Sequence, residues 1–184
     1  MKFLLFGASE FEEKLRKCGL EVDVVTDKVT AVPDGYDMGV VYRYRHIIPP
    51  GVIEDFDGKL VNLHISLLPW NRGADPNIWS FLESTPRGVT IHRVDEGLDT
   101  GPVIMQKAMH FGPTMTLRET YNQLNETVQR LFLQNWEHIY CGFFPMRDQE
   151  WTGTYHRSKD KEPYLHLLTN GWDTRVELLE GMAL

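Results

Sequence analysis

The sequence predicts an α/β fold with a mostly parallel, twisted sheet and flanking helices. Short apolar runs of strand length alternate with segments of helical periodicity in the first half of the chain. The 184 residues, of which 42% are hydrophobic and 24% charged, suit one globular domain with a sizeable core. Because alternating strands and helices favour parallel pairing with right-handed crossovers, we expect a Rossmann-like arrangement.

The first half of the chain begins with a strand, a turn and a helix. Strands are predicted over residues 2–6, 21–26 and 38–42. After the first strand, Phe11, Leu15 and Cys18 recur on one face of a predicted helix. The polar loop before the third strand leaves little room for another full helix. The lone Gly7 does not make a Gly-x-Gly-x-x-Gly fingerprint, so we expect no nicotinamide cofactor.

The second half continues with strands around Asn62 and over residues 88–94 and 102–110. Asp75 and Pro76 suit the N-cap and first position of a short helix over the residues that follow. Thr116 to Glu119 forms a capping-box pattern that opens a long core helix. Its apolar positions are Leu117, Tyr121, Leu124, Val128 and Leu131.

The composition of the sequence changes after residue 141. Proline, glycine and charged residues become frequent, and only residues 173–180 have a helix-like pattern. We therefore predict a catalytic domain over residues 1–141 and a short C-terminal extension over residues 142–184 that packs on it.

Charge and cysteine content exclude several classes of protein. A net charge of -7 gives no general attraction to polyanions, so no nucleic-acid partner is expected, although a nucleotide-sized substrate needs only a local Arg or Lys. Cys18 and Cys141 lie far apart without a Cys/His cluster, which argues against a zinc site or a disulfide framework and fits a reducing, cytoplasmic location. The apolar run over residues 3–6 is too short to cross a membrane.

Polar residues interrupt the apolar pattern in the middle of the chain. Asn62 and His64 are two residues apart in a predicted strand, so both side chains project from the same face. Residues 95–101 read DEGLDTG, a carboxylate-rich turn that lacks the spacing of a calcium loop, and we predict no metal site. An amide donor, an imidazole and a carboxylate in one cleft suit acyl transfer without a serine or cysteine nucleophile. A strand end with a hydrogen-bonded Asn and His is the structural alternative.

These motifs together resemble the formyltransferase family that uses 10-formyltetrahydrofolate. Residues 62–69 read NLHISLLP, Gly73 follows, and DEGLDTG stands downstream in the family's order and spacing. The resemblance implies a fold of the formyltransferase type and makes Asn62, His64 and Asp99 the catalytic residues. The family includes glycinamide ribonucleotide, methionyl-tRNA and nucleotide-sugar formyltransferases.

The resemblance also implies where the folate binds. Its pterin is expected against the end of the third strand and against the carboxylate-rich loop. The implied cofactor-binding residues are Tyr44, Arg45, His46, Ile47, Ile48, Val94, Asp95, Glu96 and Gly97. A basic turn at a solvated edge is the alternative for the first group. The first half of the chain looks shorter than is usual in the family.

The amino-acid sequence around residues 70–77 is most similar to that of the nucleotide-sugar members. The implied substrate-binding residues are Ser66, Trp70, Arg72 and Asp75, with a packing role as the alternative for Trp70. His92 is expected to be structural, from the alternation of its strand. In the extension, His156, Arg157 and Lys159 suit either a phosphate contact or a solvated loop.

The predicted function is formyl transfer from 10-formyltetrahydrofolate to a primary amine, most similar to that of the amino-sugar enzymes. A glycinamide ribonucleotide formyltransferase and a folate-binding protein without catalysis are the alternatives. The chain leaves no room for the separate domain that methionyl-tRNA formyltransferases carry. Folate and a nucleotide sugar are the expected partners, and pairing into a homodimer is a way in which a shortened enzyme completes itself.

Overall fold

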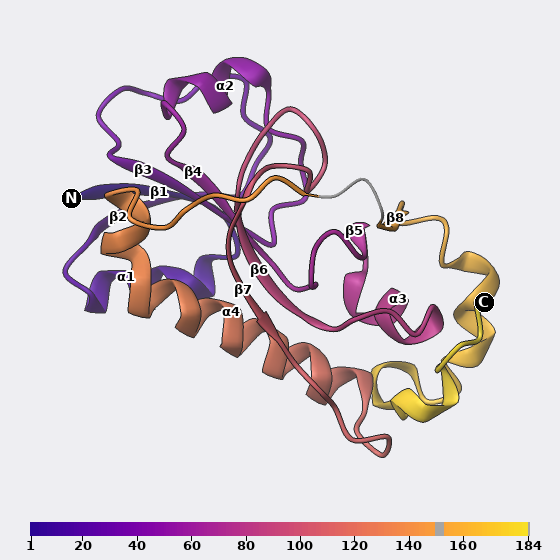
Figure 1. Ribbon diagram of the computed structural model, residues 1–184. Helices are drawn as coiled ribbons and strands as arrows, with labels where there is room; N and C mark the ends of the chain where they lie inside the picture. The colour runs from indigo at the N-terminus through magenta and orange to yellow at the C-terminus, as the bar shows by residue number, and fades with distance from the viewer. Residues whose placement is uncertain (150–152, 184) are drawn as a thin grey trace.

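The computed structural model describes residues 1–149 and 153–183, and six strands form its main sheet (Figure 1). In spatial order the strands are β2 (Glu21–Val25), β1 (Lys2–Gly7), β3 (Met38–Tyr42), β4 (Leu60–His64), β6 (Gly88–Arg93) and β7 (Val103–Ala108). The first four strands in this order pair in parallel, whereas β6 is antiparallel to both β4 and β7. The predicted mostly parallel sheet is confirmed.

Helices cover both faces of this sheet (Figure 1). α1 (Glu12–Lys17), preceded by the short 3-10 helix η1 (Ser9–Phe11), and α4 (Leu117–Tyr140) pack on one face, where Phe3 and Leu5 of β1 are buried. α2 (Pro50–Asp55) packs on the other face, against Leu4 and Phe6. Because β1 is covered on both sides, its apolar run is continuous rather than alternating. No helix lies between β2 and β3, as the short loop predicted.

The long helix α4 begins at its predicted capping box. The Thr116 hydroxyl accepts a hydrogen bond from the Glu119 backbone N–H, and the Glu119 carboxylate accepts one from the Thr116 N–H. Leu117, Leu124 and Val128 are buried, so the predicted apolar stripe faces the core. The cap fixes where the helix starts, and the stripe fixes which side faces the sheet.

Two local predictions were wrong, and a third was right in position but not in its hydrogen bond. Cys18 is exposed, because α1 ends before it and the chain turns away. Asp75 and Pro76 occupy the predicted N-cap and first position of α3 (Pro76–Leu82), but the Asp75 side chain does not cap the helix: the φ of Asp75 is 55°, and its carboxylate pairs with Nζ of Lys161 at 2.7 Å. The helix-like pattern over residues 173–180 forms two short 3-10 helices, η3 (Gly171–Asp173) and η4 (Val176–Leu178).

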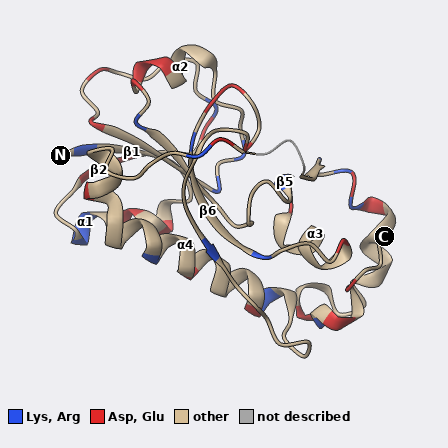
Figure 2. Cartoon of the chain, viewed as in Figure 1, with Lys and Arg blue, Asp and Glu red and all other residues tan. Residues whose placement is uncertain are grey.

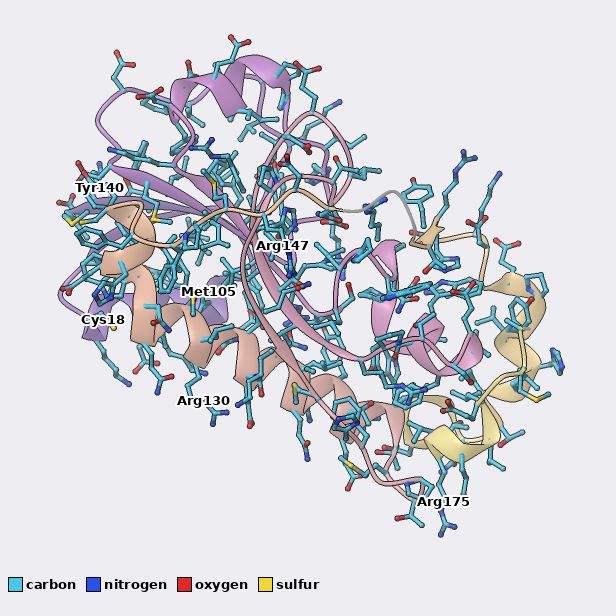
Figure 3. The ribbon with its side chains drawn as sticks, in the orientation of Figure 1. Cys18, Met105, Arg130, Tyr140, Arg147 and Arg175 are labelled. Atoms are coloured by element: carbon cyan, nitrogen blue, oxygen red, sulfur yellow. The ribbon has the colours of Figure 1, made fainter. Side chains whose placement is uncertain are left out.

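The C-terminal segment passes beside the edge strand β7 and then pairs with β5 (Arg72–Gly73), which follows β4. Arg147, which Figure 3 labels above the middle of the molecule, pairs with Val103 of β7 through an isolated bridge. β8 (Tyr155–His156) then pairs in parallel with β5, and the 3-10 helix η2 (Glu162–Leu167) follows. The division at residue 141 stays a prediction.

Charged residues are spread over the surface. The last turn of α1 is basic, with Lys14, Arg16 and Lys17, whereas α2 carries the acidic pair Glu54 and Asp55 (Figure 2). Within residues 1–149 and 153–183, no helix has the length and hydrophobicity that crossing a membrane requires. The same part of the chain contains no group of three or more His, Cys, Asp or Glu side chains that could hold a metal ion.

Candidate functional site

Asn62 and His64 at the end of β4 meet the carboxylate of Asp99. Nδ2 of Asn62 donates to Oδ1 of Asp99 at 2.8 Å, and Nδ1 of His64 lies 3.6 Å from Oδ2. The three residues predicted to act together are therefore neighbours in space. Their place beside the carboxyl end of a parallel strand is where open α/β sheets bind ligands.

Asp99 is held on several sides. Its φ is 55°, in the left-handed region, and its Oδ2 also accepts the backbone N–H of Gly73 at 2.8 Å. Burial, the largest single influence, favours the neutral acid, but the neighbouring His64 and His92 rings and the Gly73 N–H outweigh it and hold the pKa of Asp99 well below its usual range. Asp99 is therefore a carboxylate at neutral pH.

The His64 ring is anchored on the loop that follows β4. Its Nε2 lies 3.0 Å from the carbonyl oxygen of Asn71, which can only accept, so Nε2 carries a proton and donates it. Asn71 is fully buried with a φ of 57°, and its side-chain amide donates to the Thr85 hydroxyl at 2.7 Å. This anchoring turns Nδ1 of His64 toward Asp99.

His92 belongs to the same cluster. It pairs across the strands with Asn62, donates from Nδ1 to the Arg93 carbonyl at 2.8 Å and turns Nε2 toward Nδ2 of Asn62 at 3.1 Å. Nε2 also lies 3.4 Å from Oδ1 of Asp99. The alternation of its strand predicted a structural role for His92, but its neighbours depend on the antiparallel register with β4, which the sequence did not reveal.

Gln149 is the contributor that sequence reasoning missed. Its Nε2 donates to the backbone carbonyls of Asp99 and Gly101, both at 2.8 Å, while its Oε1 accepts from the guanidinium of Arg72. It lies 50 positions from Asp99 in the sequence, in a segment without a motif, so no local signal pointed to it.

The loops predicted to hold the folate flank this cluster and expose apolar side chains. Ile47 is 69% exposed on the loop after β3, and Leu98 is 45% exposed on the loop after β6. Arg45, His46, Glu96 and Gly97 are exposed too. The other predicted residues support the loops: Ile48 and Val94 pack in one cluster, the Tyr44 hydroxyl donates to the Asp27 carbonyl, and Asp95 accepts from the Gly97 N–H.

The residues predicted to bind the acceptor make contacts within the protein. The buried Ser66 hydroxyl donates to the Trp70 carbonyl at 2.7 Å, and Trp70 itself is half-buried. Arg72 bonds Gln149, and Asp75 pairs with Lys161. These contacts shape the loop beside His64, and substrate binding by the four residues stays a prediction.

In the extension, His156 stacks on Trp79, with ring centroids 3.8 Å apart and planes 6° apart. Its Nε2 lies 3.2 Å from Oε2 of Glu83, so it ties β8 to α3. Arg157 and Lys159 are exposed. His156 is therefore part of the packing and not a free phosphate ligand in this arrangement.

A family model described as formyl transferase matches residues 11–135. Among curated relatives, a methionyl-tRNA formyltransferase of Deinococcus radiodurans is 39% identical over 101 residues, which are 54% of this chain and 32% of the relative. A dTDP-4-amino-4,6-dideoxyglucose formyltransferase of Mycobacterium bovis is 27% identical over 146 residues, covering 79% of this chain and 62% of the relative. The chain thus spans less than two thirds of each.

Solved structures match over more of the chain. The formyltransferase PseJ from Anoxybacillus kamchatkensis, in complex with UDP-4,6-dideoxy-4-formamido-L-AltNAc and tetrahydrofolate, is 45% identical, with a TM-score of 0.92 and 100% of both chains covered. Rv3404c, described as a likely sugar N-formyltransferase from Mycobacterium tuberculosis, has a TM-score of 0.76 at 23% identity, with 89% of this chain and 77% of that chain covered. The second likeness concerns the fold alone.

Proposed function

The chain belongs to the formyl transferase family, and from this premise we propose that it transfers the formyl group of 10-formyltetrahydrofolate to the amine of a nucleotide-linked amino sugar. The observation that carries the proposal is the meeting of Asn62, His64 and Asp99 beside the end of β4. The likeness to PseJ, 45% identical over the whole of both chains, supports the choice of a sugar acceptor.

The proposed acceptor is the C4 amine of a UDP-linked 4,6-dideoxy sugar. PseJ is described in complex with a UDP-linked 4-formamido sugar, and a curated relative is described as acting on a dTDP-linked 4-amino sugar. Both descriptions place the nitrogen at C4. The two relatives differ in the nucleotide, and UDP follows PseJ because PseJ matches the whole of this chain.

Asn62 is the proposed donor to the oxygen of the formyl group. Its amide nitrogen carries two N–H groups, directed at Asp99 and His92 in this structure. A formyl oxygen can accept the N–H group that points at His92. The other N–H group then still holds Asn62 to Asp99. A donor fixed where negative charge develops is worth about 3 to 4 kcal/mol in comparable sites.

Asp99 supplies a negative charge and His64 a proton-transfer group for attack by the amine. The nitrogen gains positive charge as its bond to the formyl carbon forms, and the ionised Asp99 balances that charge. His64, held by the Asn71 carbonyl with Nδ1 near Asp99, moves the proton that the amine loses toward N10 of the folate. The bond between N10 and the formyl carbon breaks in the same sequence, and tetrahydrofolate leaves.

The co-substrate supplies the formyl group, and this chain offers a fitting surface for its flat ring. Ile47 and Leu98 expose apolar side chains on two loops next to the catalytic cluster. Apolar contact with a few polar groups is typical of small-molecule sites. We propose this pair of loops as the folate site.

Mass spectrometry of the reaction products tests the function directly. The protein is incubated with 10-formyltetrahydrofolate and one amine at a time: UDP-linked and dTDP-linked 4-amino-4,6-dideoxy sugars, a 3-amino sugar nucleotide and glycinamide ribonucleotide. A product 28 Da heavier with a 4-amino sugar, absent with the Asp99→Asn variant, is the expected result, since a formyl group replaces hydrogen. Formylation of glycinamide ribonucleotide alone, or folate binding without any product, would overturn the proposal.

A further inference from the structure

We propose that Gln149 is a positioning residue that holds the Asp99 carboxylate in its working orientation. Gln149 lies beyond residues 11–135, so it is not part of the segment that defines the family. The catalytic consequence rests on the proposed function. The effect on the placement of Asp99 does not, and it can be measured in the protein without substrate.

The side-chain amide of Gln149 is hydrogen-bonded at both ends. Nε2 uses its two N–H groups for the carbonyls of Asp99 and Gly101, each at 2.8 Å. Oε1 accepts from Nε and Nη2 of Arg72, at 3.1 and 2.9 Å. A guanidinium only donates and a carbonyl only accepts, so the amide has one allowed orientation. Gln149 therefore joins the loop after β6 to the loop after β4.

The loop after β6 needs such support at Asp99. A φ of 55° is unfavourable for a residue with a Cβ, and such conformations persist where surrounding contacts hold them. Gln149 bonds the backbone carbonyl of Asp99 itself. Fixing this carbonyl fixes the direction in which the side chain leaves the backbone.

Oε1 of Gln149 bonds Arg72, which is next to the residue that binds the Asp99 carboxylate. Arg72 precedes Gly73, whose N–H donates to Oδ2 of Asp99 at 2.8 Å. Gln149 thus sets the distance between the backbone of Asp99 and the backbone that its carboxylate binds. Catalytic groups lose about 10²-fold in rate from a misplacement of 1 Å, so this spacing matters for turnover.

Three variants separate this role from general support. Gln149→Ala removes the hydrogen bonds of both Nε2 and Oε1. Gln149→Glu keeps an acceptor for Arg72 but turns an anionic oxygen toward the carbonyls of Asp99 and Gly101. Gln123→Glu is the matched control, because Gln123 is an exposed glutamine on α4. If Gln149 worked only through Arg72, the Glu variant would behave like the native protein.

Amide hydrogen exchange at Gly73, followed by NMR without substrate, reports the position of Asp99. The Gly73 N–H is protected by the Asp99 carboxylate, whereas the N–H groups of Arg72 and Ala74 bond carbonyls of Thr154 and His156. In both Gln149 variants we expect Gly73 to exchange about tenfold faster or more, with Arg72 and Ala74 changed far less. Equal acceleration of all three would mean that Gln149 merely supports β5 and β8, and the proposal would fail.

Kinetics complete the test. With an amine that the protein formylates, kcat should fall about 10- to 100-fold in both Gln149 variants while KM for the folate changes little, and the control should match the native protein. Native exchange at Gly73 together with native kcat in Gln149→Glu would refute the positioning role. If the native protein formylates no amine, the proposed function fails, and Gly73 exchange still decides whether Gln149 places Asp99.

Discussion

Nδ1 of His64 lies 3.6 Å from Oδ2 of Asp99, and both groups are almost wholly enclosed, with side-chain exposures of 9% and 12%. At this distance and burial the carboxylate acts on the imidazole with little screening by water. The ring cannot turn away, because its Nε2 is bound to the Asn71 carbonyl. The pair is therefore arranged before any substrate arrives.

Replacing Asp99 by Asn should lower kcat about 10²- to 10⁴-fold, the range that a positioned acid–base group contributes. The shape is kept, but the negative charge between His64 and His92 is lost. Turnover by mass spectrometry measures the effect. Asp55→Asn, an exposed carboxylate on α2, is the control and should match the native rate. A rate for Asp99→Asn within a fewfold of native would remove Asp99 from the mechanism.

The same variant should change the pH dependence of stability. The pKa of Asp99 is lower in the folded than in the unfolded chain, so its ionised form stabilises the fold above the unfolded value of about 3.9. This stabilisation is lost as pH falls through the folded pKa, because the unfolded chain binds the proton first. Urea unfolding at several pH values between 6 and about 3 should give a shallower decline for Asp99→Asn. Parallel curves would contradict the lowered pKa.

Asn62→Ala should lower kcat about 10²- to 10³-fold, as removal of an oxyanion donor does elsewhere. Binding of folate should change little, because the predicted folate loops lie after β3 and β6. Turnover and folate affinity, measured on the same preparation, separate the two effects. A weakened affinity with unchanged kcat would make Asn62 a binding residue instead.

His156→Ala should destabilise the protein by about 1 to 3 kcal/mol, since the ring is buried and stacked on Trp79. It also removes the contact with Glu83. Urea unfolding gives the free energy, and His110→Ala, at an exposed position, is the control. A native unfolding curve would show that β8 does not depend on this stack.

Thr116→Ala should cost about 1 kcal/mol of stability, because it leaves a backbone N–H at the start of α4 without its acceptor. The matched change Thr114→Ala, two residues earlier at an exposed site, should cost much less. Urea unfolding of both variants tests the capping box. Equal losses would assign the effect to the loop and not to the cap.

The parts that the sequence predicted are those that depend on local pattern. Period-two spacing placed Asn62 and His64 on one face of β4, and the Thr116 pattern located the start of α4. The convergence of Asp99 on the first two came from a motif and not from spacing. In the folded chain the Asp75 carboxylate pairs with Lys161, 86 residues away, and local sequence rules cannot predict such a contact.

The missed parts depend on long-range register. His92 meets Asn62 only because β6 pairs antiparallel with β4 at that position. Gln149 meets Asp99 because the C-terminal segment pairs with the start of β7 at Arg147 and then continues to β5. Neither residue has a local signal, since a buried His in a strand and a Gln in a loop are ordinary. Their roles follow from which elements become neighbours.

The pairing of β5 with β8 orders the events of folding. All six strands of the main sheet lie before residue 109, so they can assemble while later residues are still being synthesised. β5 must wait for a partner, since Asn71 and Thr154, which bond beside it, are 83 residues apart in the chain. Closing so long a loop is slow compared with forming local contacts. A nascent chain can thus pair the strands of its main sheet before the contacts of Thr154 and Gln149 complete the surroundings of Asp99.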